Sequence, residues 1–224
     1  DKGSPAGNAG LMQHDWLTRL PASAAQASGD RMVLPDAEMT YFPSFYPSAQ
    51  SDCWRSTLQQ EVAWQQDSLN FGGKRVPVPR LQAWYGDAGT DYGYSGLKLV
   101  PQNWTPLLLQ LRDDVQARLD LPFNSVLLNW YRQGNDSMDW HADDEPELGS
   151  DPLIASLSFG VSRRFELRHR QRRELGKYSL ELANGSLLLM GRGMQRSWQH
   201  RIPKQPNVSG DRINLTFRLV QARS

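Results

Sequence analysis

The stretch Arg212-Ile-Asn-Leu-Thr-Phe-Arg218 alternates between polar and apolar side chains. Successive side chains of a β-strand point to opposite faces, so this alternation predicts a strand with one apolar and one polar face. We expect Ile213, Leu215 and Phe217 to pack into a core. The opposite face carries both arginines, and it must meet either water or a polar cavity.

Similar short runs fill the second half of the chain. Turn residues separate them, such as Gly134-Asn135-Asp136 and Asn184-Gly185. Many short strands at this spacing predict a sandwich or a barrel. Residues 71–101, which mix Gly, Pro and aromatic residues, also predict strands joined by turns. The expected strands of the second half cover residues 124–131, 153–160, 164–169, 177–182, 186–190, 197–202 and 211–220.

Two helices are expected in the first half of the chain. Residues 48–64 have apolar side chains at helical spacing, with Ser48 or Ser51 as the N-cap. The pair Thr105-Pro106 opens a second helix, because threonine caps an N-terminus and proline suits the first helical position. That helix runs to about Leu119. Helices packed outside a sheet predict an α+β, mainly β, fold.

Composition is consistent with one large domain and an arm. The chain has 224 residues, a net charge of +1 and 39% hydrophobic residues, which is enough for a sizeable core. Residues 1–30 are rich in Ala, Gly and Ser and are expected to form a flexible arm, with 31–224 as the folded domain. The single Cys53 excludes an intramolecular disulfide and favours a reducing, intracellular setting. No apolar run predicts a membrane span or a signal peptide.

Three residues predict a metal site. His141 and Asp143 stand two positions apart, which would place them on the same side of a strand. His200 ends another expected strand, which a sheet-rich fold can bring alongside. Two imidazoles and a carboxylate can hold one face of an Fe(II) ion and leave the other open, although zinc or manganese would also accept them. Because His-x-Asp arises often by chance, this hypothesis depends on the neighbouring motifs.

The polar face of the 212–218 strand predicts a site for a carboxylate ligand. Its two arginines can hold a dicarboxylate by charge-assisted, often bidentate, hydrogen bonds. A face turned to water is the competing interpretation, since antiparallel sheets often have one wet face. The strand around residues 129–131 can turn further polar groups inward. The expected ligand-binding residues are Asn129, Tyr131, Arg212, Asn214, Thr216 and Arg218.

A basic block lies between the His141 motif and the 212–218 strand. Six arginines fall within residues 163–173, with Glu166 as the only acid, while acidic residues gather in 143–151. The block could contact phosphates, in which case binding should weaken steeply with salt. A solvent-facing strand is the alternative. The expected nucleic-acid contacts are Arg168, Arg170, Arg172 and Arg173.

Over about residues 71–220 the chain resembles the AlkB family of Fe(II)/2-oxoglutarate dioxygenases. The matching stretches are Asn129-Trp-Tyr131, His141-Ala-Asp-Asp-Glu145, 152–160, 185–190, the strand of His200 and Arg212-Ile-Asn-Leu-Thr-Phe-Arg218. Within the family it is most similar to the branch that repairs alkylated bases in duplex DNA. That similarity lies in Val78-Pro-Arg80, Tyr85-Gly-Asp-Ala-Gly89, Tyr92-Gly-Tyr-Ser-Gly96 and the segment from Ser158-Phe-Gly160 to Arg168-His-Arg170.

The resemblance implies a specific architecture and site. The fold would be a double-stranded β-helix (jelly roll) over about 123–220, with flanking N-terminal helices and a nucleotide-recognition lid over about 71–101. His141, Asp143 and His200 would hold iron, and the ligand-binding residues named above would surround 2-oxoglutarate. The implied substrate-binding residues are Phe71, Gly72, Gly73, Arg80, Tyr92, Tyr94, Asp144 and Glu145.

The implied activity is oxidative demethylation of bases such as 1-methyladenine and 3-methylcytosine in DNA. It would use Fe(II), 2-oxoglutarate and molecular oxygen, and release succinate, carbon dioxide and formaldehyde. The damaged base must leave the helix to expose its methylated edge, and one copy of the enzyme suffices, so a monomer is expected. The setting would be cytoplasmic in a bacterium and nuclear in a eukaryote.

Two departures keep alternatives open. The segment Phe71-Gly-Gly-Lys74 is one Gly longer than the family pattern, and the basic loop from Arg168 to Lys177 is shorter than in some relatives, which would weaken the grip on a second DNA strand. One alternative is the same chemistry on RNA or on single-stranded nucleic acid. The other is a cupin-like protein that holds a metal without turnover.

Overall fold

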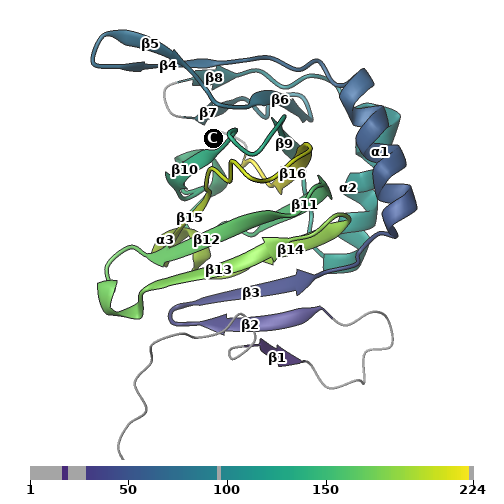
Figure 1. Ribbon diagram of the computed structural model, residues 1–224. Coiled ribbons are helices and arrows are strands. Elements are labelled where there is room, and N and C mark those ends of the chain that lie inside the picture. Colours follow the sequence, from purple (N-terminus) through teal and green to yellow (C-terminus); the bar gives the residue numbers. More distant parts are fainter. Residues whose placement is uncertain (1–16, 20–28, 95–96, 222–224) are drawn as a thin grey trace, which may run out of the picture.

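Two antiparallel β-sheets face each other, and two helices cover the outer side of the larger one (Figure 1). The computed structural model describes residues 17–19, 29–94 and 97–221. Most of the expected arm, 1–30, lies outside these residues. Within it, Leu17–Arg19 forms a short strand that pairs with the next one. No helix among the described residues is long and apolar enough to cross a membrane.

The larger sheet has eight strands in the order β1-β2-β3-β14-β11-β16-β9-β6. They are β1 (Leu17–Arg19), β2 (Asp30–Leu34), β3 (Ala37–Phe42), β6 (Leu81–Gly86), β9 (Ser125–Tyr131), β11 (Ile154–Gly160), β14 (Ser186–Met190) and β16 (Arg212–Arg218). The smaller sheet, ordered β10-β15-β12-β13, contains β10 (Met138–His141), β12 (Arg163–His169), β13 (Lys177–Leu182) and β15 (Trp198–Ile202). The expected mainly β, jelly-roll class is confirmed, although the larger sheet also takes in strands that precede residue 123.

The helices follow their capping signals only in part. Helix α2 (Pro106–Leu119) begins as expected, with the Thr105 hydroxyl accepting from the Leu108 amide at 3.2 Å. Helix α1 (Ser48–Glu61) is capped by Pro47 without a side-chain bond, so the expected serine N-cap was wrong. The Ser51 hydroxyl instead donates back to the Pro47 carbonyl. Shorter turns are α3 (Met194–Ser197), η1 (Pro146–Leu148) and η2 (Arg173–Leu175).

The two faces of β16 meet different surroundings. Ile213, Leu215 and Phe217 are fully buried in a core that includes Leu58 of α1 and Leu111 of α2. A second core lies between the two sheets. The polar face of β16 turns toward that inter-sheet space, so the alternation of one strand divides the helix-covered core from the candidate site.

Two small hairpins precede α2. The first joins β4 (Ser68–Phe71) to β5 (Lys74–Pro77), and the second joins β7 (Tyr92–Tyr94) to β8 (Leu97–Leu99). Gly72 and Gly73 form the first turn, with φ of 55° and 81°. A two-residue hairpin turn of this type needs positive φ at both positions, and glycine adopts positive φ without steric cost. The additional glycine is thus accommodated in the turn. The β4–β5 hairpin projects from the body of the molecule (Figure 1), and β5 is exposed along its length.

Candidate active site

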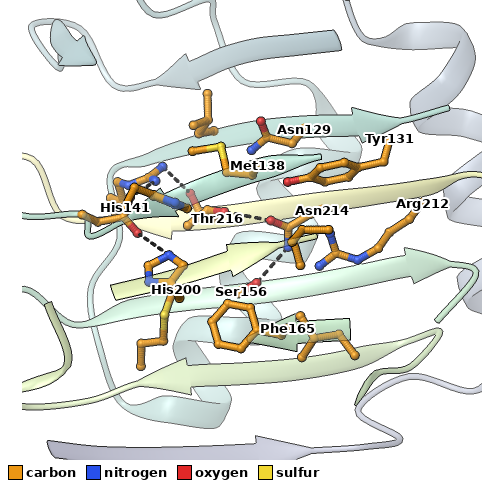
Figure 2. Close-up of a pocket in the computed structure, with 16 residues that line it drawn as sticks. Asn129, Tyr131, Met138, His141, Ser156, Phe165, His200, Arg212, Asn214 and Thr216 are labelled. Atoms are coloured by element: carbon orange, nitrogen blue, oxygen red, sulfur yellow. Dashed lines mark hydrogen bonds and ion pairs between the residues drawn. The ribbon is translucent and has the colours of Figure 1, made fainter. Parts of the chain in front are cut away.

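A pocket between the two sheets gathers the three expected metal ligands. One ligand atom from each of His141, Asp143 and His200 lies within 4.8 Å of the other two. His141 in β10 stands opposite His200 in β15, with ring centroids 4.2 Å apart (Figure 2). The inter-strand pairing therefore delivers the third ligand, as expected from a sheet-rich fold.

The local geometry of Asp143 differs from the expectation. Strand β10 ends at His141, so Asp143 lies in the following loop and not two positions along the same strand. His200 lies in the middle of β15 and does not end it. The loop is held by Gln195, whose Oε1 accepts from the backbone amide of Asp143 at 2.9 Å. The hydrogen bond to Gln195 of α3 therefore positions Asp143 next to His141, a role that we had expected a shared strand to fill.

The protein presents the triad in a state suited to a divalent cation. His141 Nδ1 lies 2.7 Å from the Asp139 carbonyl, and because a carbonyl can only accept, Nδ1 must donate. Its Nε2 is then left as the ligating atom. His200 Nε2 lies 3.9 Å from Asp143 Oδ2, which is too long for a hydrogen bond and leaves space for an ion bonded at roughly 2 Å to each.

Burial and charge set the protonation of these groups. Burial, followed by repulsion from His141, lowers the pKa of His200 to about 3. Burial also lowers the pKa of His141. Burial alone would raise the pKa of Asp143, but the charges of Arg218 and both imidazoles outweigh it and lower that pKa to about 2. At neutral pH the site therefore offers two neutral imidazoles and one carboxylate, the forms that bind a metal.

Arg212 supplies a buried cation to the same pocket as the triad. It is 1% exposed, and its Nη2 donates to the Ser158 hydroxyl at 2.9 Å. Its Nε and Nη1 are buried with no hydrogen-bond partner among the described residues. Burial lowers the pKa of Arg212 to about 10, so the side chain is still charged at neutral pH. Two open N–H groups on a buried cation fit the carboxylate of a ligand.

Arg218 makes a contact that the sequence did not predict, and its role toward a ligand stays a prediction. Its Nη2 donates to Asp143 Oδ1 at 2.6 Å, and both side chains are almost fully buried. The expectation placed both arginines around a dicarboxylate. In the structure Arg218 lines the pocket but also fixes the carboxylate of a metal ligand, so it links the cation site to the ligand pocket.

The residues between the two arginines brace the strand. Asn214 Nδ2 donates to the Ser156 hydroxyl at 2.8 Å and to the Leu157 carbonyl at 2.9 Å, and its Oδ1 accepts from Thr216. Both amide hydrogens are thus used within the protein. Asn214 and Thr216 line the pocket as expected, and so do Asn129 and Tyr131 from β9 (Figure 2). Their roles toward a ligand stay predictions.

The residues expected to contact substrate are spread over several elements. Phe71, Gly72 and Gly73 lie at the end of the β4–β5 hairpin, and Tyr92 and Tyr94 lie in β7, where only the backbone is described.

Arg80 and the acidic loop next to the triad make internal contacts. Arg80 is buried and donates to Asn129 and to the Ser137 carbonyl, and its role toward substrate stays a prediction. Asp144 accepts from Arg170 at 2.6 Å, and Glu145 lies nearby at the start of η1.

The basic block divides into one buried and several exposed arginines. Arg163 is 1% exposed and donates to the backbone carbonyls of Gln133, Gly134, Asp136 and Pro203, so including it in a surface block was wrong. Arg168 lies over the Trp140 ring, 4.4 Å from its centroid, and donates to Gln199. The four arginines expected to contact nucleic acid, Arg168, Arg170, Arg172 and Arg173, surround one surface hollow with Lys177.

Several functional candidates were missed from the sequence. Ser156 and Ser158 hold β16 from the neighbouring strand, and their spacing of two within an apolar run was a usable signal. Gln195 carries no local signal, because its contact with the Asp143 loop joins segments 52 residues apart. Gln82 lies directly across from Asn129 between paired strands, a register that only the fold defines.

Known proteins are similar to this chain in sequence over most of its length. The pattern of the 2OG-Fe(II) oxygenase superfamily matches residues 38–218. Alpha-ketoglutarate-dependent dioxygenase alkB homolog 3 of Mus musculus is 41% identical over 80% of this chain and 65% of its own length. DNA oxidative demethylase ALKBH2 of Mus musculus is 39% identical over 89% of this chain and 90% of its own. The Homo sapiens ALKBH2 is 40% identical over 78% of this chain and 70% of its own length.

Fold comparison gives a consistent result. The structure of OsALKBH1 superposes with a TM-score of 0.56 at 19% identity and covers 84% of this chain and 99% of that chain, which supports the fold alone. The chain spans about 65% of the length of the alkB homolog 3 proteins that it matches. The superfamily pattern covers most of the described residues and includes the triad and the arginine strand. The chain therefore belongs to the 2OG-Fe(II) oxygenase superfamily, within its AlkB family.

Proposed function

We propose that this protein is an Fe(II)- and 2-oxoglutarate-dependent oxidative demethylase that repairs N-alkylated bases in DNA. The observation that carries the proposal is that one buried pocket holds both the His141, Asp143 and His200 triad and the guanidinium of Arg212, whose Nε and Nη1 have no hydrogen-bond partner among the described residues. A plain metal store has no need of a buried cation beside its ligands. The similarity to proteins named DNA oxidative demethylase supports the choice of reaction and substrate.

The triad residues fit the metal that the family uses. His141, Asp143 and His200 would hold Fe(II), which supplies oxygen activation coupled to oxidative decarboxylation of 2-oxoglutarate. The overall products would be succinate, carbon dioxide, formaldehyde and the restored base. Arg218 keeps Asp143 ionised and oriented for this task, since its Nη2 donates directly to the carboxylate.

The pocket walls suit a small dicarboxylate. Arg212 would pair with the carboxylate far from the metal through its open Nε and Nη1. The Tyr131 ring packs 5.3 Å from the Arg212 guanidinium and lines the same pocket, so its position restricts where that carboxylate can lie. Leu127, Met138 and Phe165 complete an apolar wall that would exclude water from the bound ligand.

The outer features suit a nucleic-acid substrate, with duplex DNA as the proposed form. The β4–β5 hairpin projects from the body with Phe71 beside its two-glycine turn, where it could enter the space of a flipped base. The basic hollow around Arg172 and Lys177 would contact phosphates. A monomer in an intracellular setting remains part of the proposal.

An anaerobic titration tests the chemistry. Fe(II) and 2-oxoglutarate added to the purified protein should produce a weak visible charge-transfer band, and Asp143→Ala should abolish it. A methylated DNA oligonucleotide with oxygen should then yield succinate and formaldehyde in equal amounts. Metal binding without succinate release in the presence of any methylated nucleic acid would favour the cupin-like alternative and reject the enzyme.

The form of the nucleic acid is tested separately. Phe71→Ala should slow repair of a methylated duplex more than repair of the same single strand, because an aromatic wedge acts only where a base leaves a stack. Equal losses on both substrates would reject the wedge. Faster repair of RNA or of single strands by the unmodified protein would favour the single-strand alternative.

A further inference from the structure

Two buried side chains behind the pocket meet the amide of Asn129. Arg80 and Gln82 are 4% and 2% exposed, and neither is among the residues that line the pocket. Arg80 Nε donates to Asn129 Oδ1 at 2.8 Å, and Gln82 Nε2 donates to the same oxygen at 3.0 Å. Gln82 stands directly opposite Asn129 in the pairing of β6 with β9. One amide oxygen therefore receives both donors.

The arginine determines which way the amide points. A guanidinium carries only donors, so the Asn129 atom that faces Arg80 must be an acceptor. A reversed amide would set its own N–H groups against those of Arg80. The carbonyl oxygen is thus held away from the pocket and Nδ2 is turned toward it, as Figure 2 shows. With both donors in place, Asn129 presents a fixed N–H group to any ligand.

Arg80 is itself held in place between the β4–β5 hairpin and the pocket. Its Nη1 donates to the Ser137 carbonyl at 3.1 Å, and the Ser137 amide donates to the Pro79 carbonyl at 3.0 Å. These contacts tie the chain that follows the β4–β5 hairpin to the loop before β10. The side chain is thus occupied within the protein and is not available to a phosphate at the surface.

We propose that Arg80 and Gln82 are positioning residues for 2-oxoglutarate, which orient Asn129 so that its Nδ2 donates to an oxygen of the cosubstrate. The proposal rests on the proposed function, since it takes 2-oxoglutarate as the ligand. Neither residue touches the cosubstrate. Losing the Arg80 donor lets the Asn129 amide reverse, and losing the Gln82 donor loosens the hold on its oxygen, so in either case the hydrogen bond to the cosubstrate is weaker.

Calorimetric titration of 2-oxoglutarate into Mn(II)-loaded protein tests the proposal without turnover. Gln82→Met keeps the length of the side chain and removes its donor, together with an Oε1 that has no partner among the described residues. Folding stability should therefore change little, while the dissociation constant for 2-oxoglutarate should rise roughly five- to tenfold. In turnover the change should fall on the KM for 2-oxoglutarate, with kcat close to that of the unmodified protein.

Gln116→Met is the matched control. Gln116 Oε1 accepts from the Phe123 amide at 2.7 Å beyond the end of α2, and it is not a pocket residue. The same substitution there should lower the melting temperature and leave the affinity for 2-oxoglutarate unchanged. A loss of affinity in Gln82→Met alone would therefore be a positioning effect and not a consequence of lower stability.

Arg80→Lys separates the two roles available to Arg80. A positioning role predicts weaker 2-oxoglutarate binding and unchanged affinity of the metal-free protein for a methylated oligonucleotide. The opposite result would make Arg80 a nucleic-acid contact and overturn the inference. Equal 2-oxoglutarate affinity of Gln82→Met and the unmodified protein would also overturn it, whereas no binding by the unmodified protein would reject the proposed function instead.

Discussion

The pocket and the basic hollow both contain arginines, but the two regions use them differently. In the pocket, Arg212 is almost fully buried and keeps two N–H groups without partners among the described residues. At the hollow, Arg170 is 39% exposed in its side chain and already pairs with Asp144. Arg172 is 46% exposed and pairs with Glu174. The same residue type thus occurs as an unsatisfied buried cation in one region and as a partnered, solvated one in the other.

Physical chemistry explains why the difference matters. A buried charge lacking full pairing is costly to the fold, so an anion that completes its hydrogen bonds gains much from binding there. An exposed ion pair contributes about 0–1 kcal/mol and is weakened by salt. The pocket should therefore bind one specific anion tightly, while each arginine of the hollow should add a small, salt-dependent increment.

The largest expected effect is at Arg212. Arg212→Lys keeps the charge but loses the planar fork of donors, so the dissociation constant for 2-oxoglutarate should rise roughly a hundredfold or more. Calorimetry with Mn(II)-loaded protein measures it. Arg172→Lys is the control from the hollow and should leave this affinity unchanged. Similar losses in both variants would remove the distinction between the two regions.

The second largest effect is a loss of folding stability in acid, expected for metal-free protein prepared by chelation. The folded pKa of His200 is about 3, below its ordinary value of 6.5, so unfolded chains take up a proton first as the pH falls. The stabilising contribution is complete above pH 6.5 and declines toward pH 3 at about 1.4 kcal/mol per pH unit. Denaturant unfolding between pH 7 and 4.5 measures the slope.

The variant His200→Asn provides the comparison for that slope. The pKa of His141 is lowered too, so part of the dependence should remain in this variant. Bound metal should leave this dependence at least as steep, because it also keeps both imidazoles neutral in the folded state while unfolded chains still take up protons. An unchanged slope in His200→Asn would mean that the acid sensitivity arises elsewhere.

The smallest expected effect is at the hollow. Replacing Arg172 and Arg173 together by Gln should weaken DNA binding only several-fold at moderate salt, and should lower the steepness of its salt dependence by about 0.9 for each phosphate that is no longer neutralised. Fluorescence anisotropy at several salt concentrations measures both quantities. Arg31→Gln, in β2, removes an exposed arginine elsewhere and should change neither. A salt dependence that is identical in all three proteins would place the phosphate-binding residues on another surface.

The sequence was informative wherever the signal was periodic or local. The alternation in 212–218 predicted both faces of β16, and Thr105-Pro106 predicted the start of α2. The serine cap of α1 failed, because Ser51 bonds back to the carbonyl of Pro47 in place of capping the first turn. Arg163 was misassigned to the surface because a cation satisfied by backbone carbonyls of two loops has no signature in the chain.

The residue types of the triad and of the arginine strand, together with the period of two, predicted a metal site and a carboxylate-binding strand, and the family resemblance of these motifs implied the chemistry. Tertiary structure alone decided that Arg218 serves Asp143 while Arg212 stays open, and that Arg80 and Gln82 stand behind Asn129. The periodicity of the sequence predicts the face of a strand on which each side chain lies, because the backbone geometry of a strand repeats every two residues. Hydrogen-bond partners 47 to 75 positions apart depend on strand order and register, which the packing of the whole chain determines.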